Sequence, residues 1–254
     1  MSHHIVEARG LSFTYPDSTP GLHDVSFRIT HRESVAVVGR NGAGKSTLLL
    51  HINGFLHASE GEMRIGEYPI TKELLPEVRR TVGMVFQDPD DQLFMPTVYE
   101  DVAFGPVNLG LPPDEVDRLV TMALSRVEAV KLKDRPPYKL SAGEKRSAAI
   151  ASVLSMSPSI LVMDEPSSGL DPHARRNLIR LLKTFEHTKI IATHDLDMAL
   201  DMCERTLVVS EGKIAADGPT KEIMADVDLL HANGLEKPLR MQGCPVCGER
   251  GRGD

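Results

Sequence analysis

The sequence has little of what several protein classes require. It contains no tryptophan and three cysteines among 254 residues, and aromatic residues make up only 4%. Three cysteines exclude a scaffold held by many disulfides and are typical of a reducing compartment. No apolar run approaches the ~18 consecutive residues that a spanning helix needs, and the start MSHHIVEARG does not have the layout of a signal peptide. We therefore expect a cytoplasmic chain that reaches a membrane only through another subunit.

A basic excess is also missing. Lysine and arginine number 29 against 36 aspartates and glutamates, which gives a net charge of −7. Broad nucleic-acid binding depends on a basic surface, so we expect no nucleic-acid partner, although a basic pocket for a small anion stays possible. Hydrophobic residues at 41% and charged residues at 26% describe an ordinary globular chain, long enough for one large domain with an appendage.

Short β-rich runs alternate with helical stretches from about residue 33 to residue 218. Strands without polar alternation, separated by helices, indicate a mostly parallel sheet covered on both faces. The first 30 residues differ, because two runs there alternate apolar with polar residues, as half-exposed antiparallel strands do. The predicted parallel strands are residues 34–39, 81–86, 159–164, 189–193 and 206–210, and the predicted antiparallel strands are residues 5–15 and 22–29.

Residues 96–157 are predicted to form a helical insertion in this sheet domain. The segment lies between two predicted core strands and is interrupted by Gly-Pro and Pro-Pro pairs. Residues 1–235 are then one domain, which ends soon after a short helix at 221–225. Residues 236–254 form a C-terminal tail that we expect to be partly disordered, because its end, GCPVCGERGRGD, has little to bury.

A glycine-rich loop follows the first parallel strand. Residues 39–47, GRNGAGKST, match G-x-x-x-x-G-K-[ST] between a predicted strand and a predicted helix. Its glycines let the backbone N–H groups turn inward toward phosphates, and the following helix presents its positive end to the same anion. Lys45 is expected to reach the β- and γ-phosphates, and Ser46 to hold Mg²⁺. The predicted nucleotide contacts are Gly39, Arg40, Asn41, Gly42, Gly44, Lys45, Ser46 and Thr47.

A second half-site follows the strand at 159–164. The apolar run ends in Asp164 and Glu165. Asp164 is placed to hold the water shell of Mg²⁺, and Glu165 to orient or deprotonate an attacking water. Because phosphoryl transfer asks a protein mainly for positioning and charge stabilisation, this short inventory is chemically sufficient.

Further motifs, in their family order, resemble those of the ATP-binding-cassette family over about residues 5–235. The resemblance implies an α/β fold: a P-loop NTPase core with a mostly parallel sheet, an antiparallel β subdomain at the N-terminus and an inserted α-helical subdomain. It also implies ATP and Mg²⁺ as cofactors. The matching segments are LSAGEK at 140–145 for the LSGGQ signature, Gln87 for the Q-loop, residues 168–171 for the D-loop, His194 for the switch histidine and Tyr15 for the aromatic that stacks on adenine.

In this family two domains stack head to tail, and each ATP is sandwiched between one subunit's phosphate loop and the other's signature. The resemblance therefore assigns Ser141, Gly143 and Glu144 to the partner's nucleotide. It assigns the γ-phosphate to His194, and the metal and water to Gln87. One chain carries one set of motifs, so function needs a second ATPase subunit. We expect a homodimer, with a heterodimer with a paralogue left open.

Two signature residues depart from the family pattern. Ala142 replaces the first glycine, and Glu144 replaces glutamine. A methyl group at 142 is a small change if the backbone φ stays negative there. The charge of Glu144 lies close to the expected nucleotide and is expected to weaken binding or alter a ribose contact. Both departures bear on the rate of ATP turnover rather than on the reaction.

The segment QDPDDQLF from residue 87 and the segment VYEDVAFGP from residue 98 are similar to the energy-coupling-factor group, in particular its cobalt-transport ATP-binding subunits. The resemblance implies a peripheral ATPase at the cytoplasmic face of the cell membrane that energises an importer built from integral membrane subunits. It places Leu93 and Phe94 in the groove for a partner helix; the alternative is that Phe94 packs into the helical insertion.

Three questions stay open at this level. The cargo could instead be nickel or a vitamin, and a soluble cassette ATPase that acts as a mechanical switch on a protein or nucleic-acid partner is the alternative class. Cys244 and Cys247 have the spacing of a metal-ligand pair. A closed zinc site needs four ligands, so two tails would have to meet; otherwise the pair is unliganded or redox-active.

Overall fold

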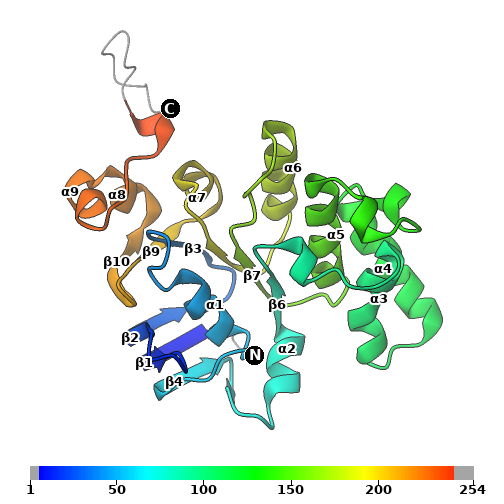
Figure 1. Ribbon diagram of the computed structural model, residues 1–254, viewed down its shortest axis with the longest axis horizontal. Coiled ribbons are helices and arrows are strands. Elements are labelled where there is room, and N and C mark those ends of the chain that lie inside the picture. Colours follow the sequence, from blue (N-terminus) through cyan, green and yellow to red (C-terminus); the bar gives the residue numbers. More distant parts are fainter. Residues whose placement is uncertain (1–5, 243–254) are drawn as a thin grey trace.

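The computed structural model describes residues 6–242 and contains two sheets (Figure 1). The smaller sheet is antiparallel, with strand order β2-β1-β4-β5. Its two long strands confirm the predicted N-terminal pair, with Val6 opposite Ile29 and Phe13 opposite Leu22. The other two strands were not predicted. The strands are β1 (Val6–Thr14), β2 (Pro20–Ile29), β4 (Glu60–Ile65) and β5 (Tyr68–Pro69).

The larger sheet has the strand order β10-β9-β3-β8-β7-β6. The five predicted parallel strands are all present and pair in parallel. The sixth, β10, runs antiparallel to β9 at the edge and was missed, because its sequence KIAADGP has few apolar residues. The strands are β3 (Ser34–Val38), β6 (Val82–Val85), β7 (Ile160–Asp164), β8 (Thr188–Ala192), β9 (Arg205–Ser210) and β10 (Lys213–Pro219).

This sheet is buried on both faces, which explains why its strands lack polar alternation. Successive side chains of a strand point to opposite faces. Ile160 and Val162 accordingly pack in one core together with the antiparallel sheet and α1 (Lys45–Ile52), whereas Leu161 and Met163 pack in the other core with the remaining helices. Helix α1 contacts strands of both sheets, so the phosphate loop that precedes it is fixed between two layers.

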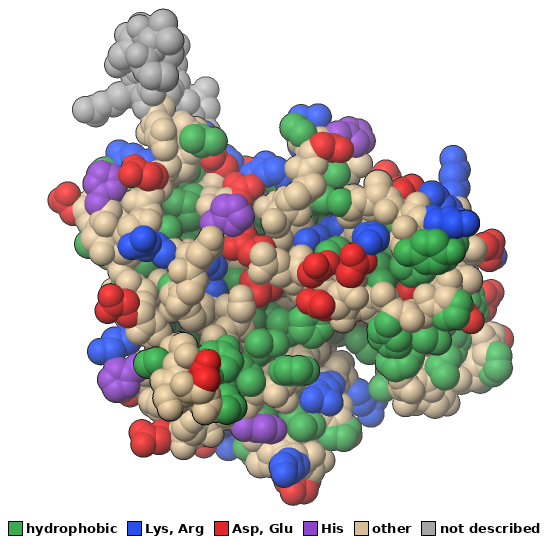
Figure 2. Space-filling model, in the orientation of Figure 1, with side chains coloured by type: hydrophobic (Ala, Val, Ile, Leu, Met, Phe, Trp, Pro, Cys, Tyr) green, Lys and Arg blue, Asp and Glu red, His purple; other side chains and the backbone are tan. Residues whose placement is uncertain are grey.

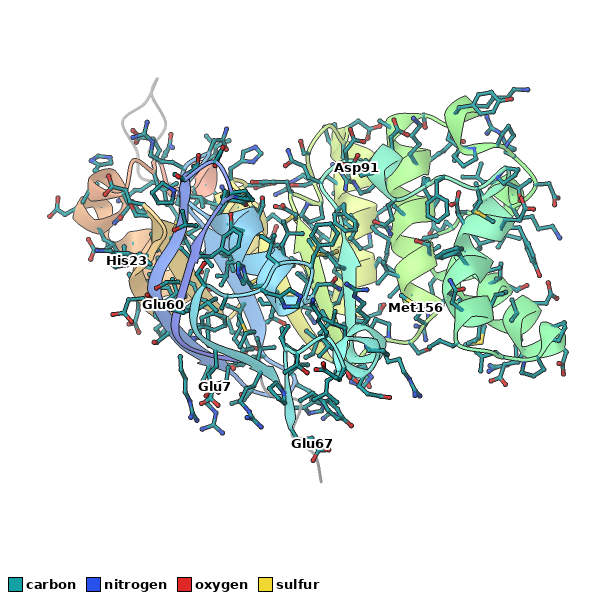
Figure 3. All side chains as sticks on the ribbon, turned by 60° about the horizontal axis from the view of Figure 1, so that its bottom comes forward. Glu7, His23, Glu60, Glu67, Asp91 and Met156 are labelled. Atoms are coloured by element: carbon teal, nitrogen blue, oxygen red, sulfur yellow. The ribbon has the colours of Figure 1, made fainter. Side chains whose placement is uncertain are left out.

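The predicted helical insertion forms one end of the molecule, opposite the antiparallel sheet. In Figure 3, Met156 marks the side of the helices, while Glu7 and Glu60 mark the antiparallel strands. Helices α3, α4 and α5 pack against one another there. Thr97 caps α3, and prolines stand at the start of α4, as is common for first-turn positions. The helices are α2 (Leu75–Thr81), α3 (Val98–Asn108), α4 (Pro113–Arg126) and α5 (Ala142–Leu154), with short 3₁₀ turns at Pro89–Asp91, Val130–Leu132 and Pro137–Lys139.

The last described segment packs back onto the sheet domain. Arg240 donates from Nε to Asp197 Oδ1 at 2.8 Å and from Nη1 to Asp201 Oδ1 at 2.9 Å, so the start of the predicted tail, up to residue 242, is held on α7. Cys244 and Cys247 lie outside the described residues. Within residues 6–242, no helix is long and apolar enough to span a membrane. The C-terminal helices are α6 (Pro172–Lys183), α7 (Leu196–Met202), α8 (Thr220–Ala225), α9 (Val227–Ala232) and the 3₁₀ turn Leu239–Met241.

Candidate functional site

A cavity of about 930 Å³ opens where the parallel strands end. Its lining includes every residue that we predicted to contact the nucleotide bound by the same chain. Gly234 and Leu235, which follow α9, also line it, and no sequence motif pointed to them. The predicted residues that line it are Tyr15, Gly39, Arg40, Asn41, Gly42, Gly44, Lys45, Ser46, Thr47, Gln87, Asp164, Glu165 and His194.

The phosphate loop needs its glycines for two different reasons. Gly42 and Gly44 have φ values of 79° and 108°, in the left-handed region that other residues rarely adopt. Gly39 makes a close approach instead, because a Cβ there would lie 2.2 Å from the carbonyl oxygen of Val209 on β9. The loop is therefore shaped by its own backbone and by contact with the neighbouring strand.

Lys45 is buried at the first position of α1. Its Nζ donates to the carbonyl oxygens of Gly39 at 2.9 Å and Arg40 at 3.1 Å. The same nitrogen lies 3.9 Å from Glu165 Oε1. The ammonium is thus held inside the loop by two carbonyl oxygens and a nearby carboxylate.

Glu165 follows β7 and makes hydrogen bonds to the end of the neighbouring strand β8 and to the residues after it. It has a φ of 45°, and its N–H donates to the carbonyl of Ala192 at 2.8 Å. Its Oε2 accepts from the backbone N–H of His194 at 3.1 Å and lies 2.7 Å from His194 Nδ1. The Glu165 side chain is buried, whereas that of His194 is 62% exposed. The carboxylate is therefore positioned from both strands, and the histidine ring remains accessible.

Asp164 has the environment of a cation ligand. Burial raises its pKa; a hydrogen bond from Ser46 opposes the rise, and the charge of Glu165 adds to it. Its Oδ1 is buried and has no hydrogen-bond partner among the described residues. A buried carboxylate oxygen without a donor, beside a serine hydroxyl, fits a hard cation such as Mg²⁺, which binds few protein oxygens and keeps waters and phosphates as its other ligands. No cluster of three or more His, Cys, Asp or Glu that could hold a metal occurs within residues 6–242.

Tyr15 lines the cavity directly after the end of β1. Its hydroxyl shares a hydrogen bond of 2.9 Å with Thr47 Oγ1, at the start of α1. Its ring meets that of Phe13 edge-on, with centroids 4.9 Å apart. The tyrosine is thus fixed relative to the phosphate loop.

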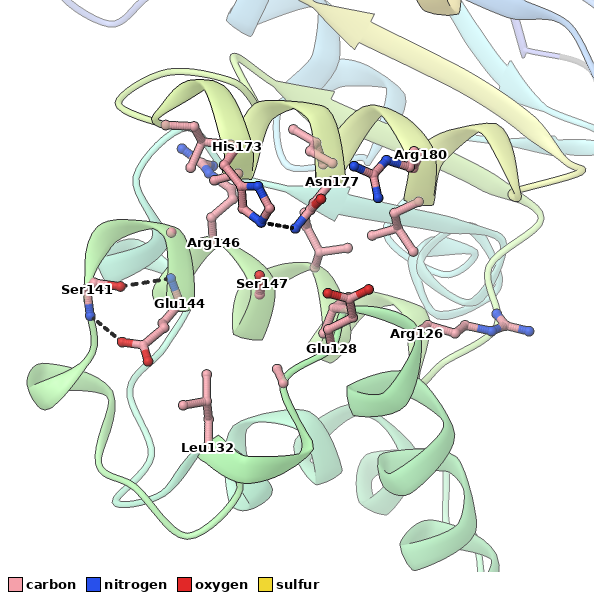
Figure 4. Close-up of a pocket in the computed structure, with 18 of the residues that line it drawn as sticks. Arg126, Glu128, Leu132, Ser141, Glu144, Arg146, Ser147, His173, Asn177 and Arg180 are labelled. Carbon is pink, nitrogen blue, oxygen red and sulfur yellow. Dashed lines mark hydrogen bonds between the residues drawn. The ribbon is translucent and has the colours of Figure 1, made fainter.

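The signature residues are placed elsewhere. Ser141 caps α5 and forms a reciprocal capping box with Glu144 (Figure 4), and Ala142 is not among the residues of positive φ, so its methyl group fits. Ser141, Gly143 and Glu144 line a second cavity of about 730 Å³, beside α6. Among the described residues that line the phosphate-loop cavity, none belongs to the signature.

Sequence reasoning missed the connection between the signature helix and the Q-loop. Arg146 is buried and donates to the carbonyl oxygens of Phe86 at 2.8 Å and Gln87 at 2.7 Å. Lys145 binds Asp90 at 2.6 Å. The only signal in the sequence was the basic pair Lys145 and Arg146 at the end of the signature segment, and a basic pair is more often solvated than buried.

A hydrophobic patch lies at the helical end, where Figure 2 shows apolar side chains gathered on the right of the view. We define the Phe94 patch as Phe94, Phe104 and Val107, whose exposed fractions are 63%, 45% and 58%. The rings of Phe94 and Phe104 meet edge-on at 5.0 Å. Asp101 Oδ1 accepts from the N–H groups of Phe94 and Met95, which fixes the loop. Leu93 is buried. Phe94 therefore contacts α3 but remains largely on the surface.

Known proteins resemble the chain in both sequence and fold. The family model described as "ABC transporter" matches residues 22–168. A Geobacter sulfurreducens protein, named provisionally as an ABC transporter ATP-binding protein, is 64% identical over 98% of this chain and 100% of its own length. The energy-coupling factor transporter ATP-binding protein EcfA of Methanocaldococcus jannaschii is 45% identical over 92% of this chain and 86% of its own.

Two solved structures agree with this. CbiO1 of Clostridium perfringens, part of the ABC transporter complex CbiONQ, has a TM-score of 0.79 and 39% identity, and covers 91% of this chain and 94% of its own. The dimeric ATP-binding cassette MJ0796, bound to ADP and phosphate, has a TM-score of 0.77 and 26% identity, with 85% and 98% covered. The chain belongs to the ABC transporter ATPases and is an ATP-binding subunit of the energy-coupling-factor type.

Proposed function

We propose that the chain drives a membrane importer of cobalt ions by closing into a dimer around ATP and opening after hydrolysis. The observation that carries the proposal is the separation of the two half-sites. All predicted contacts from one chain line one cavity, whereas Ser141, Gly143 and Glu144 line another. A second copy, stacked head to tail, supplies its signature to the open side of the first copy's nucleotide. The dimeric form of a solved relative, bound to ADP and phosphate, supports this arrangement.

The predicted residues of the cavity then have defined roles. The loop N–H groups and Lys45 bind the β- and γ-phosphates, and Tyr15 stacks on adenine. Ser46, Asp164 and Gln87 would hold Mg²⁺, and the bound ion would offset the negative charge of the phosphates. Binding of the phosphates draws Nζ of Lys45 from the loop carbonyls toward the nucleotide.

Glu165 accepts the proton of the attacking water. Its carboxylate is held from two strands, lies in a buried position and has Lys45 nearby. General-base catalysis requires a carboxylate held in reach of the water, and this geometry supplies one. His194 contacts the γ-phosphate with its exposed ring, while Nδ1 stays against Glu165.

The Phe94 patch receives a helix of the membrane subunits. Contiguous exposed apolar side chains mark interaction surfaces, and Asp101 holds this loop in place by accepting from two backbone N–H groups. The chain would then lie as a peripheral subunit at the cytoplasmic face. Cobalt as the cargo is supported by the similarity of residues 87–94 and 98–106 to cobalt-transport ATP-binding subunits; nickel or a vitamin is the alternative, because specificity lies in the membrane subunits.

An uptake experiment tests the transport function. The chain is expressed with the membrane proteins encoded beside it, and cellular uptake of radioactive cobalt and nickel is measured. Wild type is expected to support ATP-dependent cobalt uptake, and Glu165→Gln to abolish it. Phe94→Ser should reduce uptake while the isolated chain keeps its ATPase activity. Nickel uptake without cobalt uptake would overturn the cargo. Absence of neighbouring membrane-protein genes would favour the soluble switch class.

A further inference from the structure

The signature of this chain carries a negative charge at the place where it has to approach ATP. Glu144 lies in the first turn of α5, and its Oε2 accepts from the backbone N–H of Ser141 at 2.8 Å. The helix N-terminus would attract a phosphate, but here it already has a carboxylate beside it. A second negative charge brought to the same helix end meets repulsion, which grows as water is excluded.

Arg135 offsets this charge. Its Nη1 donates to Glu144 Oε1 at 3.1 Å, and its Nη2 donates to the carbonyl of Lys139 at 2.7 Å. The N–H of Ser141 and, after it, the Arg135 guanidinium hold the pKa of Glu144 below its usual range, so the carboxylate is charged at neutral pH. The pair is therefore an ion pair beside the signature, not a neutral hydrogen bond.

The backbone of Arg135 is held independently of this pair. Its N–H donates to the carbonyl of Leu132 at 2.9 Å, and its carbonyl accepts from the N–H of Val98 at the start of α3 at 3.0 Å. Truncating the side chain leaves these backbone contacts in place. The guanidinium is thus presented from a fixed segment, so a variant there changes the charge beside Glu144 with little effect on the fold.

We propose that Arg135 is a positioning residue for ATP held across the dimer interface: it neutralises and orients Glu144, so that the signature can close on the partner's nucleotide. The inference rests on the proposed sandwich dimer and deepens it. In the separated chain the two side chains are 43% and 35% exposed, so solvent screens the pair and it adds little stability. In the closed dimer water is excluded, and an unpaired Glu144 would face the phosphates directly.

The test measures the Mg-ATP concentration that gives half-maximal dimerisation, by light scattering, in the Glu165→Gln background. Arg135→Ala is expected to need about tenfold more Mg-ATP, which corresponds to about 1.4 kcal/mol. Arg135→Lys should lie near the parent, because it keeps the charge. Glu144→Gln should need the same or less Mg-ATP than the parent. Adding Glu144→Gln to Arg135→Ala should restore dimerisation to within about threefold of the parent, a small residual on the same scale.

Two controls separate this role from a structural one. Arg126→Ala removes an exposed arginine beside the same 730 Å³ cavity (Figure 4) and should leave the half-maximal concentration unchanged. Nucleotide binding to the monomer, followed by fluorescence of an ATP analogue, should be the same in the Arg135→Ala variant and its parent.

The outcomes are distinguishable. If Arg135→Ala dimerises like its parent, or if Glu144→Gln does not rescue it, the role of Arg135 is overturned and the sandwich dimer stands. If the parent binds Mg-ATP but never dimerises, the proposed homodimer falls and the inference falls with it.

Discussion

The phosphate-loop cavity and the signature end of α5 differ in how much of a binding site each holds within one chain. In the cavity, backbone turns, a buried lysine and two strand-end carboxylates already converge on one space. At the signature, the helix end is capped by its own Ser141 and Glu144, and Ser141, Gly143 and Glu144 line a separate cavity. One chain therefore holds its own side of an ATP site, and in the proposed dimer the signature would come from the second copy.

Hydrogen bonds nevertheless connect the two regions. Arg146 links α5 to the backbone at 86–87, and Gln92 reaches back from the same loop to the carbonyl of Ala149 at 2.8 Å. Gln87 lines the nucleotide cavity. Arg146 therefore connects the signature helix to the backbone of a residue that lines the phosphate-loop cavity. The two half-sites are separate within one chain, yet hydrogen bonds connect them. Both features are consistent with the proposed site, which forms only when two chains close on ATP.

The largest expected effect is a loss of ATP turnover from a substitution in the phosphate-loop cavity. Glu165→Gln should lower steady-state ATP turnover by about 10²- to 10⁴-fold, because the amide cannot accept the proton of water. ATP binding should be kept, since the loop backbone and the two carbonyl contacts of Lys45 are unchanged. Phosphate release measures the rate, and Glu67→Gln, at an exposed position, is the control that should hydrolyse normally. Near-normal turnover in Glu165→Gln would remove Glu165 from its assigned role.

The next largest effect is expected from removing the hydrogen bonds of Arg146 that connect α5 to residues 86 and 87. Arg146→Met should destabilise the fold by about 2–4 kcal/mol, because two carbonyls lose their donor in a buried place. Urea unfolding measures this. The matched variant, Lys145→Met, removes the neighbouring pair with the exposed Asp90 and should cost less than about 1 kcal/mol. An equal loss of unfolding free energy in the two variants would mean that Arg146 connects α5 to the loop no more strongly than Lys145 does.

A smaller effect falls on the signature side. Ser141→Ala removes the side-chain acceptor of the capping box, which should cost about 1 kcal/mol of stability in the monomer. It should also raise the Mg-ATP concentration needed for dimerisation while monomer binding of ATP stays unchanged. A loss of ATP binding by the monomer would contradict the separation of the two regions.

The smallest expected effect is a pH dependence on the cavity side. Because burial raises the pKa of Asp164, the free protein gains stability from its protonated form at low pH and loses it as the pH rises through that pKa. A cation needs the charged form. The thermal stabilisation by Mg-ATP should therefore be larger at pH 8 than at pH 5.5, and Asp164→Asn should flatten this difference. A difference that persists in Asp164→Asn would assign it to another group.

The parallel strands were predictable because burial on both faces leaves continuous apolar runs such as ILVM before Asp164. Strand β10 was not, because an edge strand with one solvated face carries few apolar residues. Strands β4 and β5 were missed for a similar reason: EGEMRI is half exposed and reads as loop. The outer elements depend on tertiary pairing that local sequence does not encode.

The site residues likewise fall into those that the sequence predicts and those that only the fold reveals. The loop glycines, Lys45 and Asp164 were predictable because their chemistry demands those residue types at fixed spacing. Arg146 and Arg135 were not, because an arginine's partners depend on which distant carbonyls and carboxylates the fold brings near. The motifs located the cavity, and the family resemblance already assigned the signature to the partner's nucleotide; in the structure, the described residues that line the cavity include none of the signature.

The most direct test of the shared site is the mass of purified Glu165→Gln with and without Mg-ATP, measured by light scattering. We expect a mass of 27.9 kDa without nucleotide and twice that mass with it. Removal of Mg²⁺ should return the monomer. A mass that stays at 27.9 kDa while ATP is bound would contradict the claim that two copies of this chain complete each other's nucleotide site.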